Sequence, residues 1–221
     1  MVLFPTELRG AFILTSGAKA KDKLAPSSRR NMVLPAPSIL VTEVSMRQVA
    51  FSALASLGLA VGTAASGIHD FDFLIGHEWN VKNRVLAKRL SGSNEWNEFE
   101  AVLDDVRKIA GGYGNVDRFT AVLGGEPFEG NSLRLFDPKT ETWTIYWVDS
   151  RNPELREQFT GSFENGVAEL FGEELYQGKT VKMGFIWSEI TPSSARWEQA
   201  YLDASSGEWE TNWIMEFTKA P

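Results

Sequence analysis

Polar and apolar residues alternate with a period of two along most of the chain after residue 78, and this pattern constrains the fold more than any other feature. The last two runs show it best. Trp197, Gln199 and Tyr201 share one face of the first run, and one face of the second run carries Trp209, Thr211, Trp213, Met215 and Phe217. A period of two is typical of half-buried β-strands. Because residues 203–207 between the runs have turn chemistry, the stretch predicts a strand pair.

About ten such runs follow one another, joined by short turns rich in Gly, Asn, Asp and Ser. They cover residues 78–90, 95–106, 113–122, 128–136, 143–149, 155–163, 167–176, 180–187, 195–201 and 209–217. No long amphipathic helix interrupts them, so the order of elements predicts an all-β antiparallel meander. Since closure removes exposed strand edges, we expect a closed up-and-down barrel, with a β-sandwich as the alternative.

A barrel of more than eight strands leaves interior space unless bulky side chains fill it. The apolar run of residues 71–76 (FDFLIG) precedes the first strand and ends at a glycine. This run predicts a short helical turn that plugs one end of the barrel.

The first 67 residues are a different kind of chain. Residues 1–45 lack periodicity, which predicts a disordered extension or an over-extended gene start. Residues 46–67 begin with Met46 and Arg47, continue with an uncharged Ala/Leu-rich run and end in small residues, the layout of a signal peptide. If translation starts at Met46, the protein is periplasmic or secreted; otherwise it is cytoplasmic. The alternative is a genuine extension in which residues 49–61 form a buried or amphipathic helix. Either way, residues 68–221 form the barrel domain.

Charge and composition exclude several classes of function. The net charge is −7, and acidic residues predominate after residue 66, so the domain repels phosphate backbones and we expect no nucleic-acid partner. Cysteine is absent and only two histidines occur, which leaves few ligands for a metal site, and we expect none. The apolar run of residues 49–61 is too short for a transmembrane span.

Several motifs together resemble an uncharacterised bacterial family of lipocalin-like (calycin-type) barrels. They are FDFLIG near residue 71, GNVD at 114–117, LRLFDP at 133–138, WTIYWVDSR at 143–151, ARWEQA at 195–200 and WETNWIMEF at 209–217. The resemblance covers about residue 70 to the end and implies a small-molecule-binding barrel. The start is also similar to that of the haem-binding nitrobindins, which ligate iron through a late histidine. No histidine follows His77, so we expect no haem and no other cofactor.

The candidate ligand-binding residues are four mid-strand tryptophans and the polar residues that share interior-type faces with such aromatics. The tryptophans are Trp147, Trp187, Trp197 and Trp213; the polar anchors are Asp149, Gln199, Asn115 and Arg134. Pockets for small molecules combine apolar walls with a few directed polar groups. The alternatives are plain core packing for the tryptophans and a structural network for the polar residues, for example an Arg134–Asp149 pair.

The sequence therefore predicts a barrel that binds a small apolar or amphipathic molecule, and it leaves a homodimer open. A second hypothesis is an enzyme, an isomerase, cyclase or hydrolase, with Asp149 or Asp117 as its acid or base. A third is a filled barrel with a structural role. No nucleophile elbow, P-loop or dinucleotide fingerprint occurs in the chain.

Overall fold

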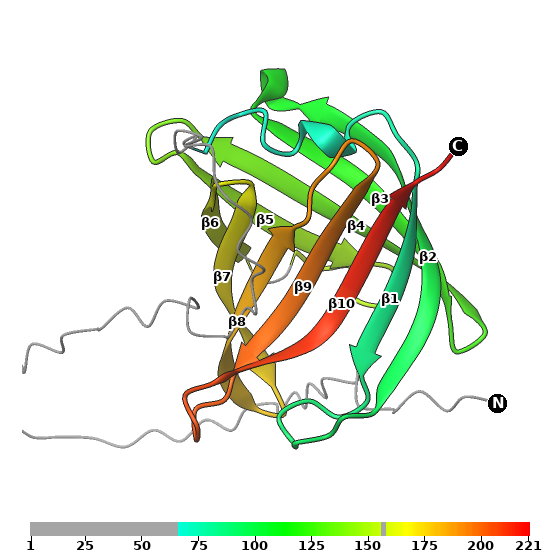
Figure 1. Ribbon diagram of the computed structural model, residues 1–221, viewed down its shortest axis with the longest axis vertical. Coiled ribbons are helices and arrows are strands. Elements are labelled where there is room, and N and C mark those ends of the chain that lie inside the picture. Colours follow the sequence, from blue (N-terminus) through cyan, green and yellow to red (C-terminus); the bar gives the residue numbers. More distant parts are fainter. Residues whose placement is uncertain (1–65, 156–157) are drawn as a thin grey trace, which may run out of the picture. The chain divides into compact units, whose positions relative to one another are not determined.

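The computed structural model describes residues 66–155 and 158–221, which form a closed antiparallel β-barrel (Figure 1). Its strands are β1 (Trp79–Leu86), β2 (Trp96–Ile109), β3 (Gly114–Leu123), β4 (Glu126–Asp137), β5 (Thr142–Asp149), β6 (Gln158–Glu164), β7 (Val167–Tyr176), β8 (Lys179–Ser188), β9 (Ser194–Leu202) and β10 (Trp209–Lys219). Within the described residues, helix is confined to two 3-10 turns, η3 (Asp72–Leu74) and η4 (Ala110–Gly112).

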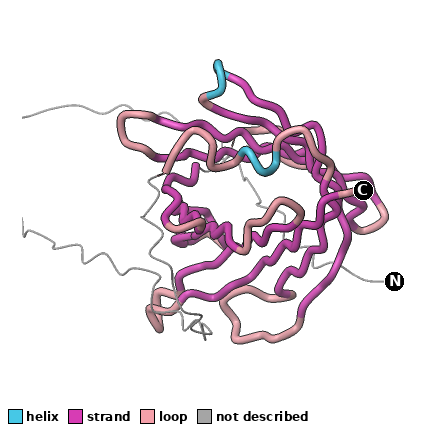
Figure 2. The backbone as a smooth tube through the Cα atoms, turned by 45° about the horizontal axis from the view of Figure 1, so that its top comes forward, coloured by secondary structure: helices cyan, strands magenta, loops and turns pink. Residues whose placement is uncertain are grey.

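The predicted up-and-down barrel is confirmed. Each strand pairs antiparallel with its neighbours in sequence, and β1 pairs with β10 from Trp79–Lys219 to Val85–Trp213 to close the ring. Figure 2 shows the strands running around this ring. Because the ring is closed, each described strand has a paired neighbour on both sides, and the alternative of a β-sandwich is excluded.

One end of the barrel is filled by residues 70–76, which we call the plug. The plug contains η3 and lies at the end where β1 begins, at the top of Figure 1. Phe71 and Leu74 are completely buried. The Phe71 ring meets Trp143, Phe163 and Trp187 edge to face, with ring centres 4.9, 5.0 and 5.8 Å apart. The predicted helical turn is therefore present and packs into the barrel core.

Polar contacts fix the plug to the strands around it. Trp143 Nε1 donates to Asp70 Oδ2 at 3.1 Å, and the Gly76 amide donates to the Val106 carbonyl oxygen at 2.9 Å. Lys108 Nζ lies 2.8 Å from Asp72 Oδ1. The plug thus has directed contacts with β2 and β5 in addition to its buried rings.

A bulge in β10 changes which residues of the last strand face the core. The register of β10 against β9 shifts between Thr211 and Trp213, and Asn212 is fully buried at the shift. Trp213, Met215 and Phe217 point inward, but Trp209 lies on the outer face, where its ring packs 5.8 Å from Phe171. The prediction that Trp209 and Thr211 share the face of Trp213 is wrong, because one extra residue reverses a strand's facing.

The predictions for residues 1–45 and for a signal peptide at 46–67 fall outside the described residues, apart from the last two. In the described part of the chain, no helix combines the length and the apolar character that a membrane span requires.

Gly161 lies where β6 and β7 approach each other closely. A Cβ at this position would lie 1.8 Å from the Glu169 carbonyl oxygen and 2.7 Å from Leu170 Cα, both backbone atoms of β7. We therefore expect Gly161→Ala to lower the free energy of unfolding by about 3 kcal/mol, measured by urea denaturation. Gly67→Ala is the control, since its nearest contact would be an ordinary 3.9 Å. Equal unfolding midpoints for the two variants would contradict the close approach.

Candidate functional site

Strand β4 carries its polar side chains toward the inside of the barrel. Gly130, Ser132 and Arg134 are buried and face inward, whereas Leu133 and Leu135 lie on the opposite face and are only half-buried. This arrangement inverts the usual preference of charged residues for water. A charge inside the barrel has to be compensated locally.

Arg134 finds that compensation on β3. Its side chain is 4% exposed, and its Nη1 lies 2.5 Å from Asp117 Oδ2 and 3.0 Å from Asn115 Oδ1. The contact with Asp117 is an ion pair rather than an aligned hydrogen bond. The guanidinium carbon also lies 5.3 Å from the centre of the Phe71 ring and 5.8 Å from that of Trp187. Two predicted anchors, Asn115 and Arg134, therefore form one cluster beneath the plug, together with Asp117.

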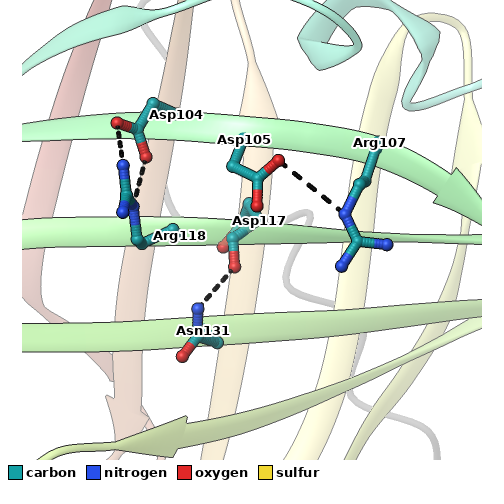
Figure 3. A network of polar contacts seen from close by, with 6 residues as sticks. All are labelled: Asp104, Asp105, Arg107, Asp117, Arg118 and Asn131. Atoms are coloured by element: carbon teal, nitrogen blue, oxygen red, sulfur yellow. Dashed lines mark hydrogen bonds and ion pairs between the residues drawn. The ribbon is translucent and has the colours of Figure 1, made fainter.

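The Asp117 carboxylate replaces part of the β3–β4 ladder. The pairing skips from Val116–Leu133 to Phe119–Gly130, and across this gap Asp117 Oδ1 accepts the Ser132 amide at 3.0 Å. Asn131 Nδ2 donates to the Asp117 carbonyl oxygen at 2.9 Å (Figure 3). These bonds orient the carboxylate toward Arg134, so Asp117 has a structural partner for each oxygen.

Asp149 does not pair with Arg134, so the example of an Arg134–Asp149 pair is wrong. Arg134 is opposite Ile145 on β5, whereas Asp149 is opposite Gly130. Asp149 therefore lies two inward-facing residues farther from the plug than Ile145 does. Its Oδ2 accepts from Trp147 Nε1 at 3.1 Å, and its Oδ1 accepts the amides of Arg151 and Asn152 at 2.9 Å each. Asp149 thus ends β5 with a turn and holds the Trp147 ring in place.

The four predicted tryptophans all face inward but form two groups. Trp187 and Trp197 are opposite each other on β8 and β9, and Trp197 meets Trp213 edge to face with centres 5.7 Å apart. Trp147 lies on the other wall, over Gly130, where an added Cβ would be 2.1 Å from its Cζ2. The structure therefore places three of the tryptophans together and separates Trp147 from them.

Buried amides orient the tryptophan group. Gln199 Nε2 donates to Asn212 Oδ1 at 2.8 Å, and Trp213 Nε1 donates to Asn83 Oδ1 at 3.0 Å. Asn83 and Asn212 were not among the predicted site residues. The alternation of β1 placed Asn83 on the inner face, but the bulge that turns Asn212 inward has no signal in the sequence.

Burial of the interior side chains changes along the barrel. Near the plug, Trp79, Trp143, Trp187 and Phe217 are at most 4% exposed. Farther from it, the inward-facing rings of Phe99, Trp147, Phe185 and Trp213 are only half-buried, as is Asp149. We call these five residues the cup. The cup lies toward the end that carries the β1–β2 and β9–β10 turns, at the bottom of Figure 1.

A second polar cluster beside the cup was missed by the sequence reasoning. Tyr201 is fully buried; its hydroxyl donates to Glu174 Oε2 at 2.5 Å and accepts from Arg89 Nη1 at 2.9 Å. Burial raises the pKa of Tyr201 far above its usual range; the Glu174 carboxylate raises it further, and Arg89 opposes this in part. Since Arg89 lies in the β1–β2 turn, no strand pattern indicated the contact.

Neither histidine belongs to these clusters. His69 Nδ1 lies 2.8 Å from Asp72 Oδ2, and His77 Nε2 lies 3.1 Å from Lys219 Nζ, both at the surface of the plug end. Within residues 66–155 and 158–221, no group of three or more His, Cys, Asp or Glu side chains is arranged to hold a metal ion.

Comparisons with known proteins assign no family to this geometry. No protein-family model and no curated protein matches the chain. The resemblance to lipocalin-like barrels stays a prediction, and the site is interpreted from its own residues.

The buried ion pair gives a stability prediction. Asp117→Asn leaves the Arg134 charge buried without its partner, so we expect it to lower the free energy of unfolding by about 3–5 kcal/mol. Asp104→Asn is the matched control, because Asp104 forms the bidentate pair with Arg118 on the outer surface (Figure 3), where water screens the charges. We expect Asp117→Leu with Arg134→Met to recover much of the loss. If urea denaturation gives Asp117→Asn and Asp104→Asn the same loss in the free energy of unfolding, this account is contradicted.

The Tyr201 cluster predicts a loss of stability in alkali. Above a pH of about 10, the unfolded chain releases the Tyr201 proton while the folded protein keeps it. The folded state then binds more protons, so the free energy of unfolding falls as the pH rises. Urea denaturation at neutral pH and at about pH 10.5 measures the loss. We expect Tyr201→Phe to reduce it; an unchanged pH dependence would show that Tyr201 ionises normally.

Proposed function

We propose that this protein binds a small apolar or amphipathic molecule in the cup of the barrel. The observation that carries the proposal is the contrast between the two ends. Near the plug, Trp79, Trp143, Trp187 and Phe217 are at most 4% exposed, whereas the rings of the cup stay half-buried although they face inward. Covering such rings with an apolar molecule is favourable in proportion to the area removed from water.

The polar residues around the cup support an amphipathic ligand. Asp149, Gln199 and Asn83 come from three different strands and are held by hydrogen bonds to Trp147, Asn212 and Trp213. Fixed polar groups between apolar walls are the usual construction of small-molecule sites. Because these side chains are oriented before any ligand arrives, little conformational entropy is lost when one binds.

The geometry favours binding over catalysis. An acid or base has to reach the substrate through a hydrogen bond. Asp117 is engaged by Arg134 and by the Ser132 amide, and Asp149 is engaged by Trp147 and by two backbone amides. Both carboxylates that were candidates for catalysis therefore have structural partners on both oxygens.

Tryptophan fluorescence tests the proposal and locates the site. The folded protein is purified gently from cells, its mass is measured under native conditions, and a co-purified molecule is extracted and identified. A panel of lipids and aromatic compounds is then titrated into the delipidated protein. We expect a fluorescence change that is lost in the double variant Trp147→Phe with Trp213→Phe.

The matched control is Trp96→Phe with Trp209→Phe, because Trp209 packs against Phe171 on the outer face and Trp96 lies under Arg84 outside the barrel. This control should keep the response. A native mass equal to that of the protein alone, together with no response to any compound, would contradict the binding proposal and favour the filled barrel.

A further inference from the structure

Two buried donors in the cluster beneath the plug have no acceptor. Arg134 Nε and Trp187 Nε1 are both inaccessible to water, and neither has a hydrogen-bond partner within the part of the chain that the structure describes. Buried donors are nearly always paired in folded proteins, because each one left without an acceptor costs free energy. Both belong to one cluster, since the Arg134 guanidinium carbon lies 5.8 Å from the centre of the Trp187 ring.

The charge of this cluster is already balanced. Arg134 and Asp117 form an ion pair with side-chain exposures of 4% and 0%. Asn115, the third member, is neutral and gives Arg134 a further acceptor. A carboxylate brought next to this pair would add an uncompensated negative charge to a buried site, and such a charge is costly. A neutral oxygen would supply the acceptor without that cost.

We infer that the ligand carries an uncharged carbonyl group, whose oxygen accepts hydrogen bonds from Arg134 Nε and Trp187 Nε1. This inference rests on the proposed function and names the chemical class of its ligand: an apolar ketone, ester or lactone rather than a fatty acid or other anion. A carbonyl oxygen has two lone pairs and can serve both donors. The apolar part of the molecule then extends toward the cup.

Small side chains separate the cup from the two donors. On β4, the inward positions from the far end to Arg134 are Phe128, Gly130 and Ser132. Trp147 covers Gly130. The buried Phe119 ring, opposite Gly130 on β3, lies 6.1 Å from the Trp147 ring, so both rings border the space between the cup and the two donors.

Three naphthalenes of nearly equal shape test the inference by calorimetry at neutral pH. They are 2-acetylnaphthalene, with a neutral carbonyl, 2-naphthoate, with a carboxylate, and 2-ethylnaphthalene, with no acceptor. We expect the ketone to bind about thirtyfold more tightly than the hydrocarbon, as for two additional hydrogen bonds, and the carboxylate to bind more weakly than the ketone. The infrared carbonyl stretch of the bound ketone should shift to lower frequency than in alkane solvent.

Trp187→Phe is the decisive variant, because it removes the N–H and keeps most of the ring. It should lower the advantage of the ketone over the hydrocarbon to about fivefold, the share of the remaining bond from Arg134 Nε, while binding of the hydrocarbon changes little. The matched control is Trp143→Phe, since the Trp143 N–H is already bonded to Asp70. The control should keep the advantage of the ketone. If Trp187→Phe does not fold, Asp117→Leu with Arg134→Met replaces it, with the same expected loss.

The outcomes separate this inference from the proposed function. Binding of the carboxylate as tightly as the ketone overturns the inference and leaves the binding proposal intact. Equal affinities for ketone and hydrocarbon, unchanged by Trp187→Phe, also overturn it and indicate that water serves the two donors. Failure of all three compounds, together with a clean apo mass and no fluorescence response in the panel, overturns both.

Discussion

The interior of a ten-stranded barrel has to be filled, and the rest of this structure follows from how that is done. Ten strands enclose more space than their own side chains readily occupy. The plug solves the problem at one end, where Phe71 packs against Trp143, Phe163 and Trp187. Toward the other end the inward rings are not fully covered. The cup is therefore a part of the interior where apolar rings still meet water.

A buried charge in the filled half is the second consequence. Arg134 is placed inside by the pleat of β4, and everything around it serves to compensate it: Asp117 and Asn115 from β3, and the rings of Phe71 and Trp187. Regular β3–β4 pairing is interrupted at Asp117, where the carboxylate accepts the Ser132 amide instead. A sequence built for stability alone would do as well with apolar residues here, because buried ion pairs rarely stabilise more than a well-packed core. The carbonyl group proposed above would give the two unpaired donors, Arg134 Nε and Trp187 Nε1, an acceptor.

Much of the fold was predictable from the sequence, and the reason is local. The ten runs of alternating residues and the turns between them gave strand positions close to those of β1–β10, because side-chain facing in a strand depends only on the period of two. The same rule placed Trp147, Trp187, Trp197 and Trp213 inside, together with Arg134, Asn115 and Gln199. It failed at Trp209, where the bulge in β10 inserts one residue and reverses the facing.

By itself, the sequence determined the all-β class, the order of the strands and the facing of most strand residues, the start of β10 excepted. Only the tertiary structure decided which of those residues meet. Arg134 pairs with Asp117 rather than Asp149, Trp147 stands apart from the other three tryptophans, and Arg89 reaches Tyr201 and so brings the β1–β2 turn to β9. The physical reason is that periodicity fixes the facing of a residue, while its height in the barrel and its partners depend on register, bulges and closure, which are set by all ten strands together.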